Sequence, residues 1–164
     1  MTPLRYVLTH VYPVAFALLP PQMDSPQARA MLTAVGLQES RFLHRRQVGP
    51  GPARGWFQFE MGGVEGVLSH YASRPSAEAV CHILGYDPLD ERGVHLAIEH
   101  NDVLAVCFAR LLLWTDPRLL PSADRPVDGW TQYLATWRPG KPKPSTWGAH
   151  FAAAWREESG TVRA

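Results

Sequence analysis

An acidic residue, Glu39, prolongs an apolar stripe in the stretch Gly36-Leu37-Gln38-Glu39-Ser40. The apolar residues on the same helical face lie four, seven, eight and eleven positions before it, at Val35, Leu32, Met31 and Ala28. A glutamate at this position faces the core or a cleft. Burial disfavours the charged form of a carboxylate and raises its pKa, so that it can hold a proton near neutral pH. Glu39 is therefore a candidate general acid.

A purely structural role for Glu39 is the alternative reading. Three arginines follow it closely in the chain, and an ion pair at the helix end would satisfy the carboxylate: Arg41, Arg45 and Arg46. The place of Glu39 on the apolar stripe favours a cleft, but these residues alone leave both readings open.

The elements that position Glu39 are predicted to be helices, because apolar residues recur every three or four positions and few runs alternate. We therefore expect a mostly α fold. The helix that ends at Glu39 is predicted to begin after Ser25, the N-cap, with Pro26 at its first position. A first helix is expected over residues 3–18. The segment 41–61 is rich in Gly, Pro and Arg, and predicts an irregular connection or a small β-hairpin beside the cleft.

Further helices are predicted over residues 62–71, 76–84, 95–114, 127–137 and 145–157. The apolar face of the segment 95–114 is broad, so we expect a long helix that is buried on most sides. Asn101 falls on this buried side, where it either points into the cleft and binds substrate or is satisfied within the core. No internal repeat appears, and residues 1–164 are expected to form a single domain.

Composition narrows the classes of function. With 164 residues, 46% of them apolar, the chain is long enough to bury one core without staples. A net charge of +1 provides no global field for nucleic acid, which is not expected as a partner. The apolar stretch 4–19 contains Arg5, His10 and Pro13 and is shorter than a bilayer span of about 20 residues. We interpret it as a helix of the fold, and expect neither a membrane span nor a signal peptide.

Other kinds of site are not indicated. Cys81 and Cys107 are the only cysteines, and we expect both to be buried free thiols. The seven histidines show no ligand spacing such as HExxH, and no metal site is expected. No phosphate-binding glycine loop or serine nucleophile elbow occurs, and no cofactor is expected.

The segment Ala34–Phe42 resembles a motif of the lytic transglycosylases and goose-type lysozymes, a branch of the lysozyme-like superfamily. In that motif a helix ends in Glu-Ser, and an aromatic residue follows two positions later. A second family motif, Gly followed by two apolar residues and Gln, comes about twenty residues on. Gly55-Trp56-Phe57-Gln58 is similar to it. The resemblance covers about residues 25–140 and implies a lysozyme-like fold. The C-terminal helix expected over residues 145–157 lies outside the part that the resemblance covers.

The resemblance implies cleavage of the β-1,4 bond between N-acetylmuramic acid and N-acetylglucosamine in peptidoglycan. Glu39 would protonate the leaving oxygen. In the transglycosylase branch the same residue then acts as a base, and the muramoyl 6-hydroxyl attacks the anomeric carbon to give a 1,6-anhydro product. Hydrolysis by two carboxylates would need a partner about 5–9.5 Å away. Three acidic residues are candidates and are also explained as surface charges: Glu60, Glu65 and Asp102.

The same resemblance suggests roles for four further residues. Ser40 would hold the loop or a sugar substituent, unless it only caps the helix. Gln58 would bind substrate through its amide, unless it only satisfies a turn, and Gly55 would allow close backbone approach. The family's third signature, Tyr-Asn, is absent. Tyr133 occupies the corresponding region, and its hydroxyl would orient the carboxyl of Glu39 if it is not an ordinary core residue.

The leading hypothesis is a peptidoglycan-cleaving muramidase or lytic transglycosylase, with peptidoglycan glycan strands as substrate. The sequence shows no export signal, wall-binding repeat or anchor, so a bacteriophage particle or lysis system is expected to bring the protein to the cell wall. This predicts a place in the virion, with other virion proteins as partners, or in the host cytoplasm before release. One alternative is a structural or assembly protein of a phage virion with altered activity. Another is a glycan-binding module without chemistry.

Overall fold

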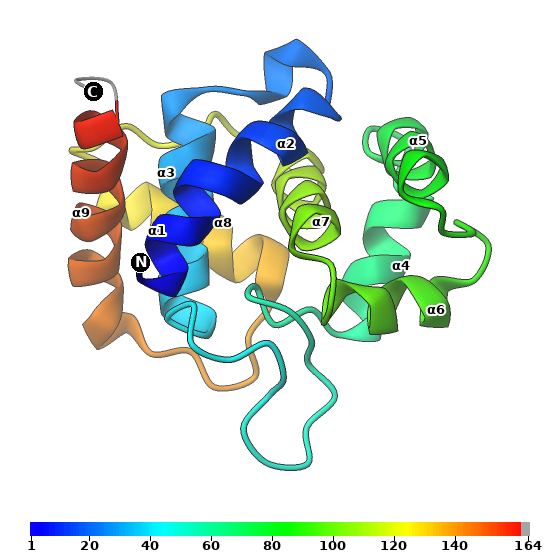
Figure 1. The fold of residues 1–164 in the computed structure, drawn as a ribbon. Helices are drawn as coiled ribbons and strands as arrows, with labels where there is room; N and C mark the ends of the chain where they lie inside the picture. The colour runs from blue at the N-terminus through cyan, green and yellow to red at the C-terminus, as the bar shows by residue number, and fades with distance from the viewer. Residues whose placement is uncertain (162–164) are drawn as a thin grey trace.

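The computed structural model describes residues 1–161, and most of these residues lie in helices (Figure 1). The mostly α class is therefore confirmed. The N-terminal helix consists of α1 (Pro3–Tyr6), a π-helical turn (Val7–Val11) and α2 (Tyr12–Ala17), and a 3-10 turn (Pro21–Met23) follows. The remaining helices are α3 (Pro26–Glu39), α4 (Met61–Ser69), α5 (Arg74–Leu84), α6 (Glu91–Ile98), α7 (Asp102–Trp114), α8 (Pro126–Trp137) and α9 (Pro144–Thr161).

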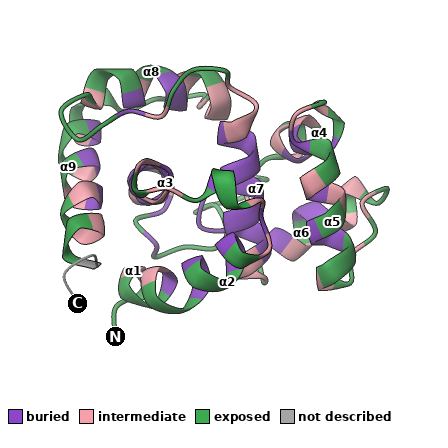
Figure 2. Cartoon of the chain, turned by 90° about the horizontal axis from the view of Figure 1, so that it is seen from above, coloured by how far each residue is buried: buried purple, intermediate pink, exposed green. Residues whose placement is uncertain are grey.

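The helix that carries Glu39, α3, lies at the centre of the larger part of the molecule. Figure 2 shows it end-on, with α1, α2, α7, α8 and α9 arranged around it. Its predicted start is confirmed, because the Ser25 hydroxyl accepts a 3.0 Å hydrogen bond from the Ala28 N–H and Pro26 follows the cap. Residue 28 and all of residues 30–36 are buried. The apolar stripe thus belongs to a helix that other helices surround on nearly every side. This packing explains why the carboxyl at the end of the helix is largely removed from solvent.

The helix α7 separates two groups of helices. In Figure 2 the helices α4, α5 and α6 lie on one side of α7, and the helices around α3 lie on the other. Residues 104–113 of α7 are all buried, as the broad apolar face predicts. The C-terminal end of α3 and the N-terminal end of α4 consequently lie on opposite sides of a cleft.

The prediction of one long helix over residues 95–114 is wrong. The structure has two helices there, α6 and α7, with a break over residues 99–101. Asn101 takes an extended conformation, and its Oδ1 accepts a 3.0 Å hydrogen bond from the Leu104 N–H. Its Nδ2 donates to the Tyr86 hydroxyl at 3.1 Å. Asn101 is therefore the N-cap of α7, a position that this residue type favours, and the apolar periodicity on both sides conceals the break.

The first helix is also less regular than predicted. The Tyr12 N–H bonds to the Val7 carbonyl, five residues back, and this widens the turn just before Pro13. Proline has no N–H and its ring clashes with the carbonyl four residues earlier, so the π-helical turn accommodates it without ending the helix.

The connection between α3 and α4 is irregular. Among residues 1–161 it contains isolated β-bridges, Arg46 with Arg54 and Arg54 with Phe59, but no strand, so the hairpin alternative is not realised. Two ion pairs hold this connection against the end of α6 and the start of α7. Arg54 Nε lies 2.9 Å from a carboxylate oxygen of Glu99, and Arg45 Nη2 lies 2.7 Å from one of Asp102. The connection therefore has a defined position without sheet pairing.

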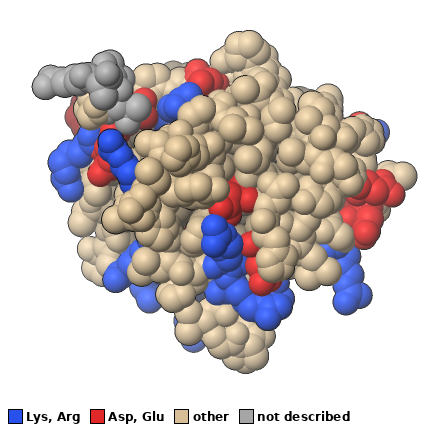
Figure 3. Space-filling model, viewed as in Figure 1, with Lys and Arg blue, Asp and Glu red and all other residues tan. Residues whose placement is uncertain are grey.

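On the face of the molecule shown in Figure 3, lysine and arginine side chains lie beside acidic ones in several places, and other residues cover most of the surface. Cys81 and Cys107 are both buried and free. Within residues 1–161, no helix combines the length and the apolar character that crossing a bilayer requires.

Candidate active-site cleft

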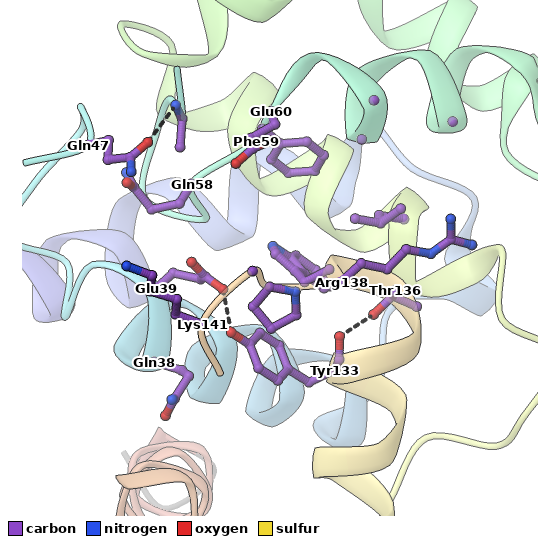
Figure 4. Close-up of a pocket in the computed structure, with 18 of the residues that line it drawn as sticks. Gln38, Glu39, Gln47, Gln58, Phe59, Glu60, Tyr133, Thr136, Arg138 and Lys141 are labelled. Carbon is purple, nitrogen blue, oxygen red and sulfur yellow. Dashed lines mark hydrogen bonds between the residues drawn. The ribbon is translucent and has the colours of Figure 1, made fainter. Parts of the chain in front are cut away.

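A cavity of about 750 Å³ lies between the two groups of helices. One wall comes from the end of α3, from α8 and from the segment after α8. The opposite wall comes from the connection between α3 and α4 and from α4 itself. The residues labelled in Figure 4 show this arrangement, with Gln38, Glu39, Tyr133 and Thr136 below and Gln47, Gln58, Phe59 and Glu60 above.

Glu39 is the last residue of α3 and lines the cleft. Its Oε1 accepts a 2.6 Å hydrogen bond from the hydroxyl of Tyr133, drawn as a dashed line in Figure 4. Burial raises the pKa of Glu39 to about 7, against a smaller lowering by the Tyr133 hydrogen bond and with a further rise from the charge of Glu60. A substantial fraction of the molecules thus carries a protonated carboxyl at neutral pH.

Tyr133 is held in place by three indole rings. Its ring centroid lies 5.3 Å from that of Trp130, 5.3 Å from that of Trp147 and 6.3 Å from that of Trp137. Burial, followed by the nearby charge and hydrogen bond of Glu39, raises the pKa of Tyr133 well above its ordinary value. The hydroxyl therefore stays protonated and remains a donor to the carboxyl.

Ser40 connects the two sequence motifs. Its hydroxyl donates a 2.6 Å hydrogen bond to the carbonyl of Trp56 and accepts one of 3.1 Å from the Phe42 N–H. Ser40 is buried, and its own N–H bonds to the carbonyl of Gly36. Ser40 is the C-cap of α3, and its hydroxyl also holds the loop through Trp56, so the capping reading and the loop-holding reading both describe it.

The chain reverses immediately after Ser40. Arg41 and Phe42 both have positive φ, 54° and 55°, and the Phe42 ring packs back onto Gly36. A side chain at position 36 would collide with that ring, which explains a glycine inside a buried helix. This reversal ends α3 at Glu39 and leaves its carboxyl at the cleft.

Gly55 and Gln58 form a tight turn opposite Glu39. Gly55 has φ +73°, and a Cβ there would meet the side chain and carbonyl of Ile98. The Gly55 carbonyl accepts hydrogen bonds from the Gln58 N–H at 3.1 Å and from Gln58 Nε2 at 2.9 Å. Among residues 1–161, no group donates to Gln58 Oε1. Gln58 both closes its own turn and presents a free acceptor at the wall of the cleft.

The three candidate partner carboxylates have different surroundings. Glu60 lines the cleft with Glu39. Asp102 accepts hydrogen bonds from two of the guanidinium nitrogens of Arg45, Nε at 2.9 Å and Nη2 at 2.7 Å. Glu65 is exposed on α4 and is not among the residues that line the cavity. Glu60 is therefore the one of the three that shares the space with Glu39.

Asn101 lies outside the cleft, since its side chain caps α7 and bonds to Tyr86. The structure thus brings together five of the six residues named from the sequence as site residues or their supports: Glu39, Ser40, Gly55, Gln58 and Tyr133.

Sequence reasoning missed the contribution of Gln38 and of the C-terminal helix. Gln38 Nε2 donates to the Lys143 carbonyl at 3.0 Å, while its Oε1 accepts from Thr146 Oγ1 at 3.0 Å and from His150 Nδ1 at 2.9 Å. These bonds fix α9 beside the end of α3. No local signal identifies a pairing across more than a hundred residues.

The basic rim of the cleft was also missed, although its charges are visible in the sequence. Arg138, Lys141 and Lys143 follow α8 and line the cavity. The run of prolines among them predicts a stiff turn and gives no indication of which way the charges face.

In the described part of the chain, no group of three or more His, Cys, Asp and Glu side chains could hold a metal ion. Comparison with protein-family models, with curated proteins and with solved structures finds no significant match to this chain. The geometry of the cleft is therefore the basis on which a function can be argued.

Proposed function

We propose that the protein cleaves the β-1,4 bond between N-acetylmuramic acid and N-acetylglucosamine in peptidoglycan, as a muramidase or lytic transglycosylase with a lysozyme-like fold. The observation that carries the proposal is the 2.6 Å hydrogen bond from Tyr133 to a cleft carboxyl, Glu39, that burial keeps partly protonated. Gln58 lines the same cavity. An acid, an orienting donor and an amide at one cleft suit a glycosidic bond.

Glu39 supplies the proton in the first step. Because Tyr133 donates to Oε1, that oxygen acts as the acceptor and the acidic proton resides on Oε2. Transfer of this proton to the glycosidic oxygen breaks the bond between that oxygen and the anomeric carbon, and the leaving sugar departs as an alcohol. Glu39 is then a carboxylate, and the Tyr133 hydrogen bond stabilises its new charge.

The second step can take two routes from this point. In transglycosylation, Glu39 removes the proton of the muramoyl 6-hydroxyl as it attacks the anomeric carbon, which regenerates the acid and gives the 1,6-anhydro end. One carboxylate suffices for this route. In hydrolysis, a water attacks, and Glu60 is the cleft carboxylate that could take its proton.

Zymography on purified peptidoglycan tests the proposal. The wild type should clear the gel, and Glu39→Gln should not, because the amide has no acidic proton. Glu65→Gln is the matched control, since Glu65 is an exposed carboxylate outside the cavity, and it should clear normally. No clearing by the wild type, or equal clearing by Glu39→Gln, overturns the proposal and favours a structural or glycan-binding role.

Mass spectrometry of the released fragments separates the two routes. Anhydromuramoyl ends identify transglycosylation, and reducing muramic acid ends identify hydrolysis. The association with a phage virion stays a prediction, which a proteomic inventory of purified particles would test.

A further inference from the structure

A second cavity, of about 290 Å³, adjoins Glu39 on the side of α9. Glu39, Gln38, His44 and Lys143 line both this cavity and the main cleft. The other residues that line it come from the chain reversal after α3 and from the first turns of α9: Ser40, Arg41, Leu43, Thr146 and His150. The acid thus lies between two adjoining spaces, and a substituent of a sugar bound at Glu39 lies close to the second.

The second cavity carries cationic side chains that are not neutralised by the protein. Within residues 1–161, neither Arg41 nor Lys143 forms an ion pair, whereas arginines nearby are paired, such as Arg45 with Asp102 at 2.7 Å. Glu39 is the acidic residue among those that line this cavity. Since burial favours its protonated form, the cavity has a positive balance of charge.

The polar groups between these cations are already fixed. Gln38 Oε1 accepts hydrogen bonds from Thr146 and His150, so the His150 proton on that side resides on Nδ1. His150 Nε2 has no partner among the described residues, and His44 also makes no hydrogen bond within residues 1–161. Arg41 and Lys143 are exposed and line the cavity, so both charges are accessible to a ligand. The cavity therefore has a rigid floor, free imidazole nitrogens and two free cations.

We propose that this cavity binds a carboxylate carried by the muramoyl residue next to the bond that is cleaved, with Arg41 and Lys143 as its ligands. The inference rests on the proposed function and names a determinant of its specificity. A planar guanidinium binds a carboxylate with two parallel hydrogen bonds, and the ammonium of Lys143 adds a second charge. Two carboxylates have this chemistry: one of the peptide stem, or the lactyl carboxylate of a muramic acid that has lost its stem.

Three substrates distinguish these sources, measured with Arg41→Gln and Lys143→Gln. They are stem-bearing peptidoglycan, glycan strands stripped of their stems, and a neutral oligomer of N-acetylglucosamine. Each variant should raise KM about tenfold on the substrate that carries the recognised carboxylate, with kcat little changed. An effect on stem-bearing peptidoglycan identifies the stem carboxylate, and an effect on stripped strands identifies the lactyl carboxylate. The neutral oligomer should show no change.

Arg92→Gln is the matched control, because Arg92 is exposed on α6, outside both cavities, and this variant should behave as the wild type. Unchanged KM on both anionic substrates, or an equal rise on the neutral oligomer, overturns the inference while the clearing activity stands. Thermal unfolding midpoints confirm that each variant folds.

Calorimetry with muramoyl dipeptide measures the same site without turnover. The wild type should bind it more tightly than the N-acetylglucosamine dimer, and Arg41→Gln should abolish the difference. If the wild type does not clear peptidoglycan, the proposed function fails, and this binding difference decides the inference separately. N-Acetylmuramic acid, whose lactyl carboxylate is free, is measured in the same way, and the inference is overturned if the wild type binds it and muramoyl dipeptide no more tightly than the N-acetylglucosamine dimer.

Discussion

The Tyr133 hydroxyl lies 2.6 Å from Oε1 of Glu39, although the two residues are 94 positions apart and belong to different helices. The bond joins α8 to the end of α3 at the cleft. It stabilises the charged form of the carboxyl, whereas burial opposes that form more strongly and leaves the pKa of Glu39 at about 7. The position of α8 therefore orients the acid and limits the rise in its pKa that burial causes.

Tyr133→Phe should raise the pKa of Glu39 further, because the one hydrogen bond that lowers it is lost. An acid catalyst works in its protonated form, so activity is lost as the pH rises through its pKa. The alkaline limb of the kcat/KM profile should therefore move from about pH 7 to higher pH. We expect kcat to fall about tenfold or more, because the carboxyl is no longer oriented and its charge no longer stabilised.

The control for this prediction is Tyr86→Phe, which removes a hydroxyl bonded to Asn101 outside the cleft. Its pH profile should match that of the wild type. An alkaline limb that stays in place in Tyr133→Phe would show that the hydrogen bond does not act on the catalytic group.

Glu39→Gln should stabilise the protein at alkaline pH. The folded-state pKa of Glu39 is raised above its unfolded value, so the folded state binds more protons between about pH 4.5 and 7 and loses stability as the pH rises through that window. At about 1.4 kcal/mol per pKa unit, reduced because water enters the cleft, the amide should gain about 2 kcal/mol at pH 8 and little at pH 4. Urea unfolding at both values measures this. A gain that is the same at pH 4 and pH 8 would contradict the assigned shift.

Gly55→Ala should destabilise the fold by about 1–3 kcal/mol, because φ is +73° and the added methyl would meet Ile98. Gly148→Ala is the matched change, since a Cβ in α9 meets nothing within 4 Å. That substitution should instead stabilise by about 0.5–1 kcal/mol, the difference in helix propensity. Thermal unfolding of both variants checks the opposite signs, and equal effects would show that the turn tolerates a side chain.

Ser40→Ala should cost about 1–3 kcal/mol, because the buried carbonyl of Trp56 would lose its 2.6 Å hydrogen bond. Since the same bond positions the Gly55–Gln58 turn against α3, activity should fall more than stability alone explains. Activity is measured at a temperature where the variant is fully folded. Thr9→Ala, which removes an exposed hydroxyl bonded to the Arg5 carbonyl, should change neither quantity appreciably.

Glu60→Gln should shift the alkaline limb of the pH profile to lower pH, because the charge of Glu60 raises the pKa of Glu39. The size of the rate change then reports on the mechanism. A modest change with anhydromuramoyl products agrees with a single catalytic carboxylate, and loss of a hydrolytic reaction assigns Glu60 as the base that activates water. A limb that does not move would show that Glu60 and Glu39 do not interact across the cleft.

The helix that carries the acid could be predicted closely from the sequence. Ser25, Pro26 and the apolar spacing are local signals, and the structure confirms the start and the burial that they predict. The resemblance at Glu39 and Gln58 also led to two residues that line one cavity. The helix could be predicted because its signals come from neighbouring residues, and Glu39 and Gln58 could be identified because each belongs to a short motif.

The remaining features depend on pairings that periodicity does not encode. Asn101 followed by Asp102 is an N-cap signal, but the apolar pattern on both sides favoured a continuous helix. That the hydroxyl of Tyr133 reaches Glu39 depends on the packing of α8 among three indole rings. The second cavity forms because α9 lies beside the end of α3, and no sequence pattern indicates that these two helices are neighbours.

The bonds from Gln38 to Lys143, Thr146 and His150 have a practical consequence for anyone who alters this protein. The residue next to the acid is attached directly to the start of α9, so the last helix is a wall of the reaction site and not an accessory. Shortening the chain there, or replacing α9 in a fusion, would remove that wall and leave the Gln38 amide to find new partners. A trimmed variant that folds but no longer works would thus report damage at Glu39, one residue away from the lost contact.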